Sequence, residues 1–267
     1  MELLGKPIRL KILEDIEIRI QNGEKIEPYI FYNSKSFEAD EYKKLVNRTL
    51  LKLGLNPKVF NVTSLAEAEE VIKQANADPL GSIFLCRPLK IKGEEKLFDL
   101  VDPYKDADML TTHNFGRLAK GNLDCLSGTA RSVSKILDYY NIDVANKRVL
   151  IVGRSISVGM PIALMMIKKN GFVCVSHSKI DIKQTRLMAE NSDIVVMATG
   201  ERNILTPEQI KPNQIIIDCG YQEDGKGDLG FVPECQDYTP VPGGVGPATI
   251  ACLIENAFNL VRDSKNK

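Results

Sequence analysis

Residues 149–166, "VLIVGRSISVGMPIALMM", join a β-branched apolar run to a glycine-containing turn and then to an apolar helix. A dinucleotide site needs glycine where the backbone approaches a pyrophosphate, and a helix amino terminus whose free N–H groups face that anion. Gly153 and Gly159 are placed to provide both. Their spacing is G-x-x-x-x-x-G and not G-x-G-x-x-G, so the turn fits equally well a strand-to-helix connection in which the glycines serve only geometry.

Basic and hydroxyl side chains near this turn indicate which dinucleotide it would bind. Arg154 follows the first glycine and is placed to meet a phosphate. The next β-rich run, "FVCVS", ends in "SHSK" (176–179), without the acidic residue that binds a free ribose hydroxyl in NAD sites. Arg154, Ser178 and Lys179 therefore favour a 2′-phosphate, and with it NADP over NAD.

Short β-rich runs alternate with helical patterns, which predicts an α/β fold. The first series contains "PYIFYN", "PKVFNV" and "SIFLC", with helices expected over residues 39–53 and after the capping box from Ser64 to Glu67. After a helix near "TARSVSKILDYYN", the second series contains "RVLIV", "FVCVS", "DIVVMAT" and "QIIIDCG", with a short helix after Thr206. The runs are apolar without alternation, as in parallel strands that are covered on both faces.

The chain of 267 residues is longer than one compact core usually holds, which predicts two domains. We expect an amino-terminal α/β catalytic domain and a Rossmann-type dinucleotide-binding domain with a mainly parallel sheet. The last helical pattern, "TIACLIENAFNLVRD", follows the second series and is expected to fold back onto the first domain. The predicted boundaries are therefore 1–124 plus 246–267 for the catalytic domain and 125–245 for the Rossmann-type domain.

The charge balance argues against a polyanionic partner, because the chain has 35 lysines and arginines and 35 aspartates and glutamates. A small-molecule ligand fits this composition better than nucleic acid or an anionic membrane. Residues 1–20 are charged throughout, and no apolar run approaches the roughly 20 residues that span a bilayer, which predicts a cytoplasmic protein. The six cysteines form no C-x-x-C pair and the chain has only two histidines, so no metal site is expected.

A second glycine cluster, "TPVPGGVGPAT", occupies residues 239–249, after the last strand of the second series. A rigid hinge between domains is one interpretation. The other is a ligand face, because bare backbone on both sides of Val245 allows a flat ligand to lie against the main chain.

Four stretches resemble the methylenetetrahydrofolate dehydrogenase/cyclohydrolase family: "VGRSISVGMPIALMM", "DPYKDADML", "NFGRLAKG" and "TPVPGGVGPATIACLIENA". The resemblance extends from about Pro28 to the end of the chain. It implies a folate-binding catalytic domain completed by the carboxy-terminal helix, a Rossmann domain for NADP, a folate cleft between the two, and a homodimer. It also implies hydride transfer from 5,10-methylenetetrahydrofolate to the nicotinamide, which gives the 5,10-methenyl cation, and hydrolysis of that cation to 10-formyltetrahydrofolate.

The resemblance assigns cofactor roles to positions that match the family's motifs. Gly153, Arg154 and Ser155 fall on its dinucleotide loop, and Ser178 falls on its 2′-phosphate contact. Tyr221, which follows "DCG", falls on a nicotinamide-side backbone contact that is more often isoleucine.

The resemblance also assigns substrate roles. Asp108 in "KDAD" falls on the carboxylate that binds the pterin, whose donor edge a fixed acceptor can read. Tyr42 falls on the ring that packs on the folate. The helical spacing alone fits a half-buried packing residue at Tyr42, because it belongs to an ordinary amphipathic stripe. The residues expected to line the ligand cleft are Pro242, Gly243, Gly244 and Val245.

The catalytic helix departs from the family pattern, which is Y-x-x-x-K with a glycine twelve residues after the tyrosine. Tyr42 and Gly54 keep this register, but the lysine position is Val46. Residues four apart share a helix face, so we expect Lys43 and Lys44 to be turned away and unable to replace the lysine. The chain is therefore identified as a divergent member of the family that lacks the catalytic lysine.

The stretch "LCRPLK" (85–90) departs as well, because the family has V-Q-L-P-L-P there. Cys86 replaces the glutamine, and strand alternation places Arg87 on the opposite face. We expect Cys86 to be inert packing and not a nucleophile, since no histidine is identifiable beside it. Met109 replaces the glycine after the family's aspartate, and His113 in "TTHNFG" is the only local candidate for a new acid or base.

The residues leave three functional hypotheses open. The first, favoured by Tyr42, Asp108 and the cofactor loop, is an NADP-dependent methylenetetrahydrofolate dehydrogenase of one-carbon metabolism in which cyclohydrolase activity is weak or absent. The second is a family-derived NADP oxidoreductase with a different substrate. The third is a catalytically silent folate- or dinucleotide-binding protein. Formation of NADPH from methylenetetrahydrofolate separates the first from the other two, and binding without turnover indicates the third.

Overall fold

The computed structural model describes residues 1–264, which fold into two compact units. One unit contains Lys11–Arg117 together with residues 250–264, and we call it the three-stranded unit. The other contains Met1–Leu10 and Leu118–Thr249, and we call it the five-stranded unit. Both units alternate strands and helices, which confirms the predicted α/β class.

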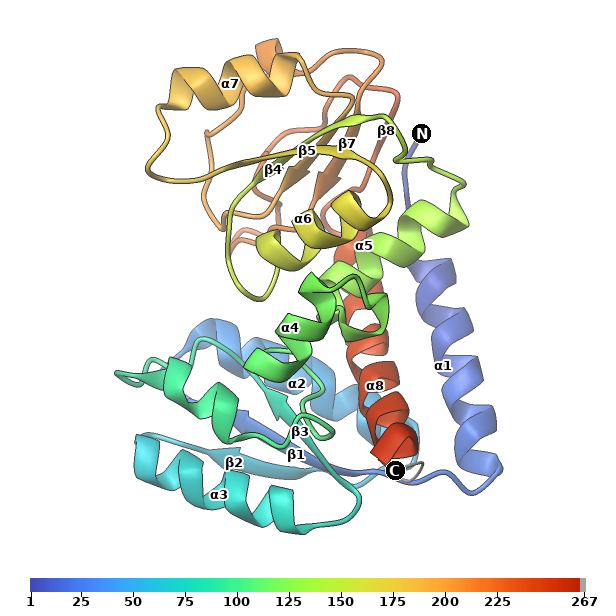
Figure 1. Ribbon diagram of the computed structural model, residues 1–267, viewed down its shortest axis with the longest axis vertical. Coiled ribbons are helices and arrows are strands. Elements are labelled where there is room, and N and C mark those ends of the chain that lie inside the picture. Colours follow the sequence, from blue (N-terminus) through green and yellow to red (C-terminus); the bar gives the residue numbers. More distant parts are fainter. Residues whose placement is uncertain (265–267) are drawn as a thin grey trace. The chain divides into compact units, whose positions relative to one another are not determined.

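The sheet of the three-stranded unit has the order β2-β1-β3, with parallel pairing throughout. Its strands are β1 (Glu27–Tyr32), β2 (Lys58–Asn61) and β3 (Gly81–Leu85). The helices α2 (Phe37–Lys52) and α3 (Leu65–Ala77) connect them and lie on opposite faces of the sheet (Figure 1). This coverage explains why β1 and β3 are continuous apolar runs.

Strand alternation gives the two faces of this sheet different roles. Phe31 and Leu85 are register partners and pack with α3 in one hydrophobic core. Their neighbours Tyr32 and Cys86 therefore point to the other face, on which α2 packs. The backbone nitrogen of Cys86 donates a 2.8 Å hydrogen bond to the carbonyl of Phe31, which continues the pairing beyond the end of β3.

The sheet of the five-stranded unit has the order β5-β4-β6-β7-β8, again with parallel pairing. β5 pairs with one edge of β4, and the later strands β6, β7 and β8 extend the sheet from its other edge, as in doubly wound sheets. Ligands of such sheets bind outside the carboxyl ends of the strands, at this switch point. The strands are β4 (Arg148–Val152), β5 (Phe172–Ser176), β6 (Ile194–Met197), β7 (Ile215–Asp218) and β8 (Asp237–Tyr238). The order confirms the predicted Rossmann-type sheet.

Helices and short 3₁₀ turns connect the strands within each unit (Figure 1). The turn after Thr206 forms as predicted, as a single 3₁₀ turn. The remaining elements are η1 (Glu94–Leu100), α4 (Thr112–Ala119), η2 (Leu123–Cys125), α5 (Gly128–Tyr139), α6 (Gly159–Lys168), α7 (Ile182–Glu190) and η3 (Pro207–Gln209).

Three helices contribute residues to both units: α1 (Lys6–Gln21), α4 and α8 (Val245–Ser264). The sequence predicted α8 but not α1. Ile8, Ile12 and Ile16 follow one face of α1 and are buried, and charged residues separate them along the sequence. The apolar stripe of α1 is therefore present but narrow.

The first ten residues lie in the five-stranded unit, whereas the predicted boundaries place them in the catalytic domain. Backbone hydrogen bonds explain the difference, because Leu3 donates to the carbonyl of Tyr238 at 2.7 Å and Gly5 donates to that of Gly243 at 2.9 Å. The start of the chain thus extends the five-stranded sheet beside β8. From Ile250 onward, α8 lies in the three-stranded unit.

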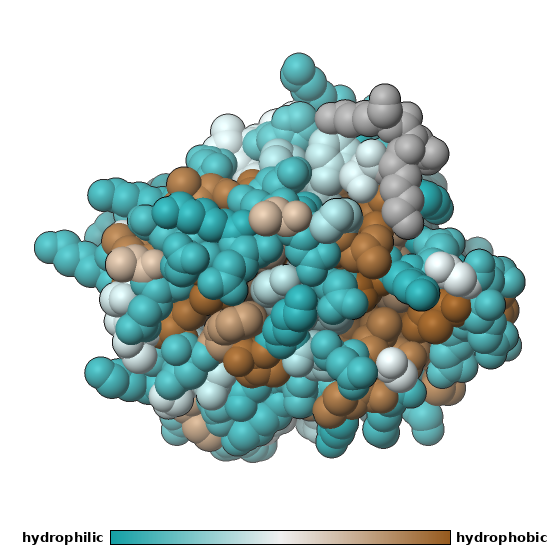
Figure 2. Space-filling view, turned by 90° about the horizontal axis from the view of Figure 1, so that it is seen from below, coloured by the Kyte–Doolittle hydropathy of each residue, from teal (hydrophilic) through white to brown (hydrophobic). Residues whose placement is uncertain are grey.

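Figure 2 shows the molecule from below, where hydrophilic side chains surround separate groups of hydrophobic ones. On α3 the buried positions are Ala68, Ile72 and Ala75, and Glu70 between them is exposed. None of the helices in residues 1–264 has the length and apolar character that a membrane span requires.

Candidate functional site

The turn after β4 is held by contacts that only glycine permits. Gly153 has a φ of 121°, and a Cβ there would lie 2.1 Å from the carbonyl oxygen of Ala198. A Cβ on Gly159, the first residue of α6, would lie 2.2 Å from the carbonyl oxygen of Gly153. Packing therefore explains both glycines. This packing also positions the loop between the two glycines, residues 154–158, at the carboxyl end of β4.

The loop itself has the features of an anion site. Arg154 and Ser155 are exposed just before the amino terminus of α6. The Oγ of Ser155 accepts hydrogen bonds from the nitrogens of Val158 at 3.1 Å and Gly159 at 3.3 Å, so the hydroxyl holds the loop against the helix. A helix amino terminus beside an exposed guanidinium attracts phosphate.

The loop after β5 starts at the same edge of the sheet. Val152 and Ser176 are register partners, and the nitrogen of Gly153 donates a 2.9 Å hydrogen bond to the carbonyl of Ser176. Ser178 and Lys179 follow and are exposed. The structure thus places the predicted 2′-phosphate residues on loops that leave adjacent strands, which fits a dinucleotide with a phosphorylated ribose.

Two buried carboxylates that the sequence analysis did not identify hold the loops after β6 and β7. Asp228 accepts hydrogen bonds from the backbone nitrogens of Thr199 at 2.7 Å and Gly200 at 3.0 Å. Asp218 accepts from the nitrogens of Gly220 at 2.9 Å and Leu229 at 3.0 Å. Burial raises the pKa of Asp218, against the effect of these N–H groups. The only sequence signal is an acid within two residues of a glycine, in "DCG" and "GDLG".

Tyr221 lies beyond these loops with an exposed side chain. The chain reaches it from β7 through Gly220, where a Cβ would lie 2.0 Å from Oδ1 of Asp228. The predicted contact of Tyr221 with the nicotinamide is through its backbone. Substitution of Tyr221 is therefore less restricted than substitution of Gly220.

The second glycine cluster is also explained by close packing. Gly243 has a φ of 120°, and a Cβ on Gly244 would lie 2.6 Å from Cβ of Thr239. Gly5 packs against this segment so closely that a Cβ on it would lie 2.0 Å from the carbonyl oxygen of Gly244. Pro242 follows a cis peptide bond, and Val245 begins α8 and is buried. These contacts fix the segment, and its role as a ligand face stays a prediction.

In the three-stranded unit, Tyr42 and Val46 lie one turn apart on α2. Val46 is 0% exposed, so the position of the family's lysine is filled by packed hydrocarbon. Tyr42 is half-buried. Burial raises the pKa of its phenol, and Asp108 and Cys86 raise it further.

Asp108 is positioned by β3. Its Oδ2 accepts a 2.8 Å hydrogen bond from the nitrogen of Leu85. Burial raises the pKa of Asp108 to about 7; the Leu85 N–H opposes this rise, Asp106 adds to it and Arg87 opposes it. Asp106 itself is held by the backbone nitrogens of its own turn, including that of Thr111 at 2.8 Å. Asp108 is therefore the acid of this pair that can receive a ligand.

The residues that follow β3 behave as predicted. Cys86 is fully buried, and burial together with Asp108 raises the pKa of its thiol, so the thiol stays protonated and packs. The guanidinium of Arg87 lies over the ring of Phe98 at 4.8 Å and its Nε is 3.2 Å from Oε1 of Glu94. Phe98 belongs to the core on the α3 face, which confirms that Arg87 points away from Cys86.

One expectation about α2 is wrong. Lys44 is turned outward, with 57% of its side chain exposed, but only 17% of the Lys43 side chain is exposed. Lys43 follows Ala39 by four residues and precedes Val46 by three, so it lies in the buried stripe of α2. Its Nζ is 4.3 Å from the ring centroid of Tyr32 and 2.8 Å from Oδ1 of Asp40.

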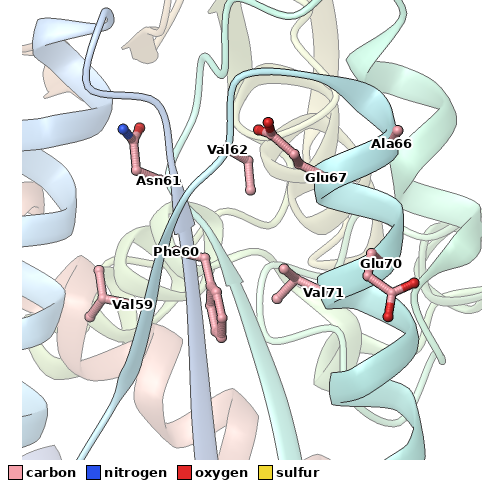
Figure 3. A pocket seen from close by; sticks show the side chains of 8 residues that line it. All are labelled: Val59, Phe60, Asn61, Val62, Ala66, Glu67, Glu70 and Val71. Atoms are coloured by element: carbon pink, nitrogen blue, oxygen red, sulfur yellow. The ribbon is translucent and has the colours of Figure 1, made fainter.

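Two further features lie outside these clusters. His113 is exposed on α4, and its role as a new acid or base stays a prediction. A shallow groove of about 600 Å³ lies between β2 and α3, where Phe60 and Val71 point toward one another (Figure 3). The groove is on the α3 side of the sheet, opposite Tyr42. Within residues 1–264, no group of three or more His, Cys, Asp or Glu side chains is arranged to hold a metal ion.

Comparison with known proteins agrees with this geometry. The profile described as "Tetrahydrofolate dehydrogenase/cyclohydrolase, NAD(P)-binding domain" matches residues 127–265. Bifunctional protein FolD 2 of Lactobacillus johnsonii is 36% identical over 208 residues, which cover 75% of this chain and 73% of the relative.

Solved structures match the chain over nearly its whole length. The bifunctional 5,10-methylenetetrahydrofolate dehydrogenase/cyclohydrolase of Thermoplasma acidophilum is 30% identical, covers 100% of both chains and has a TM-score of 0.86. The methylenetetrahydrofolate dehydrogenase-cyclohydrolase of Trypanosoma brucei, solved with NADP and an inhibitor, is 25% identical, covers 98% of this chain and 96% of its own, and has a TM-score of 0.88.

Proposed function

This chain belongs to the tetrahydrofolate dehydrogenase/cyclohydrolase family, and we propose that it is an NADP-dependent methylenetetrahydrofolate dehydrogenase of one-carbon metabolism with little cyclohydrolase activity. The names of its relatives include both activities. One observation carries the proposed imbalance: Asp108 is held at the end of β3 and Tyr42 is kept on α2, while Val46, one turn from Tyr42, fills the lysine position and is fully buried.

The substrate residues would hold the pterin and leave the bridging carbon free to react. Ionised Asp108 accepts hydrogen bonds from the donor edge of the pterin, and Tyr42 offers a ring for packing. Hydride transfer depends chiefly on holding the reacting carbon in place, and these groups suffice for that. Hydrolysis also needs proton exchange as the ring opens, which neither Val46 nor the protonated Cys86 thiol supplies.

The cofactor residues fit NADP. Bound NADP would supply the hydride acceptor. The exposed Arg154 would pair with its 2′-phosphate, with Ser178 and Lys179 from the adjacent loop, and the amino terminus of α6 would face its pyrophosphate. The T. brucei relative was solved with NADP, which supports the same choice here.

The proposal includes a cytoplasmic homodimer. Phe172 on the edge strand β5 is 74% exposed, and Leu187 and Met188 on α7 are exposed too. Cys174, on the same side of β5 as Phe172, contacts Met188 at 3.6 Å between the sulfurs, so these side chains form one apolar surface. Such a surface at a sheet edge supports pairing of two copies through the five-stranded unit.

One assay of the purified protein tests the function. NADPH formation is followed with methylenetetrahydrofolate, and decay of methenyltetrahydrofolate is followed separately. We expect the first and at most a slow second. Absence of NADPH formation would refute the dehydrogenase; binding of both ligands without turnover would then indicate a silent binding protein, and NADP binding without folate binding would indicate a different substrate.

A further inference from the structure

Lys43 places a fixed positive charge on the α2 side of the sheet in the three-stranded unit. Its side chain lies in the buried stripe of α2, and its ammonium is 4.3 Å from the ring centroid of Tyr32. A cation over an aromatic face is attracted by the ring, so this contact holds the ammonium on the inner side of the helix. Asp40 holds the same ammonium at 2.8 Å.

The positive charge of Lys43 also affects Cys86. Tyr32 and Cys86 end the adjacent strands β1 and β3 and point to the same face of the sheet. Lys43 lowers the pKa of the Cys86 thiol, against the larger effect of burial. Asp108, a proposed substrate residue, raises the pKa of the same thiol and also that of Tyr42, the other proposed substrate residue. Lys43 therefore adds positive charge to the cluster that would hold the folate.

The proposed reaction changes the charge of the folate. Hydride leaves the bridging carbon with both electrons of its C–H bond and reduces the nicotinamide, so the folate gains one positive charge and the nicotinamide loses one. A fixed cation near the folate disfavours the charged product and leaves the uncharged bridge of the substrate almost unaffected.

We propose that Lys43 sets the preference of the folate site between charge states: its ammonium weakens binding of the methenyl cation relative to folates with an uncharged bridge, and so promotes release of the methenyl product before hydrolysis. This inference rests on the proposed function. Because Asp40 reduces the field of the ammonium, the effect is several-fold and not a hundredfold.

Binding of two folates to four proteins tests the proposal. 5,10-Methenyltetrahydrofolate and tetrahydrofolate are titrated into the wild type, Lys43→Gln, Lys43→Arg and Lys44→Gln, with rapid mixing so that spontaneous hydrolysis is negligible. Lys43→Gln should tighten methenyl binding about threefold to tenfold and change tetrahydrofolate binding by less than about twofold. Lys43→Arg keeps the charge and should match the wild type. Lys44→Gln is the matched control, because Lys44 points outward and pairs with Asp40 and Glu41.

The outcomes separate this inference from the proposed function. Equal changes for both folates in Lys43→Gln would show a packing role and overturn the proposal, as would unchanged or weaker methenyl binding. In both cases, a wild type that binds tetrahydrofolate and forms NADPH would still support the proposed dehydrogenase function. A wild type that binds neither folate would overturn the dehydrogenase, and the role of Lys43 with it.

Discussion

The Oδ2 atom of Asp108 accepts a 2.8 Å hydrogen bond from the backbone nitrogen of Leu85, which fixes this carboxylate at the carboxyl end of β3. A single backbone donor does not offset the burial of the carboxylate, so the pKa of Asp108 rises to about 7. Asp108 therefore changes its charge within the physiological range, and both ligand binding and stability should depend on it.

Folate binding should weaken as the pH falls below 7. Only the ionised Asp108 accepts hydrogen bonds from the N–H groups of the pterin through both carboxylate oxygens, so the Kd for tetrahydrofolate should rise by up to about tenfold for each pH unit below about 7. Titrations between pH 5.5 and 8.5 measure this. Asp108→Asn is the control and should bind weakly without the transition. A wild-type Kd that stays constant over this range would contradict the role of Asp108.

Ionisation of Asp108 should lower the free energy of unfolding at high pH. The pKa of Asp108 is raised on folding, so its contribution to the free energy of unfolding is fully present below about pH 4 and is lost as the pH rises through about 7. Asparagine cannot ionise and can still accept from Leu85. Asp108→Asn should therefore stabilise the protein at pH 8 by roughly 1–2 kcal/mol, with no gain at pH 4. Thermal unfolding at both pH values checks this. The exposed Asp15→Asn should show no such difference, and an equal gain at both pH values would point to a cause other than ionisation.

Cofactor choice should depend on Arg154. Loss of one charge-assisted contact with the 2′-phosphate costs roughly 1.5–3 kcal/mol, or about 10- to 150-fold in affinity. Arg154→Ala should weaken NADP binding by this factor and leave NAD binding nearly unchanged. Arg148→Ala, at the opposite end of β4, is the matched control. Equal or tighter binding of NAD by the wild type would refute the preference.

Dimer formation should depend on the apolar surface at β5 and α7. A buried glutamate at an apolar interface is strongly unfavourable, so Phe172→Glu with Leu187→Glu should give monomers at micromolar concentration. Light scattering gives the mass of the wild type and of this variant. Phe37→Glu, an exposed phenylalanine of the three-stranded unit, is the control and should stay dimeric. A monomeric wild type would remove the dimer from the proposal.

The fold was predictable where the physical signal is local. The apolar runs "RVLIV" and "SIFLC" became β4 and β3, because parallel strands covered on both faces need no alternation. α1 was missed because its three buried isoleucines form a narrow stripe among charges, and tertiary packing decides whether such a stripe is buried.

The site was predictable only in part. Family motifs predict a substrate role for Asp108, and the structure adds the Leu85 contact and the raised pKa of the carboxylate. The orientation of Lys43 was wrongly predicted, because the helix face was defined from Tyr42 and Val46 alone. The buried stripe also includes Ala39, which moves its centre toward Lys43. The buried pair Asp218 and Asp228 organises loops that are distant in sequence, so no local pattern identifies it.

The last prediction concerns the lost hydrolysis. A positioned amine that exchanges protons is worth about 10²–10⁴ in rate, so wild-type cyclohydrolase activity should lie at least about a hundredfold below the dehydrogenase activity. Val46→Lys places an amine one turn from Tyr42, but position 46 is fully buried and lacks an orienting partner. Val46→Lys with Cys86→Gln should therefore recover about tenfold or more of the hydrolysis, and Val46→Lys alone should recover less.

Decay of methenyltetrahydrofolate, corrected for spontaneous hydrolysis, measures the effect in the wild type and in each variant. Val46→Met is the matched control, because it lengthens the side chain without adding an amine and should recover nothing. NADPH formation measured on the same preparations distinguishes lost folding from lost chemistry, since hydride transfer needs only the positioning that Tyr42 and Asp108 provide. Rapid enzyme-dependent decay in the wild type would mean that another group has taken over proton exchange. His113→Ala would then be the first variant to examine, because an imidazole exchanges protons near neutral pH and this histidine is exposed on α4.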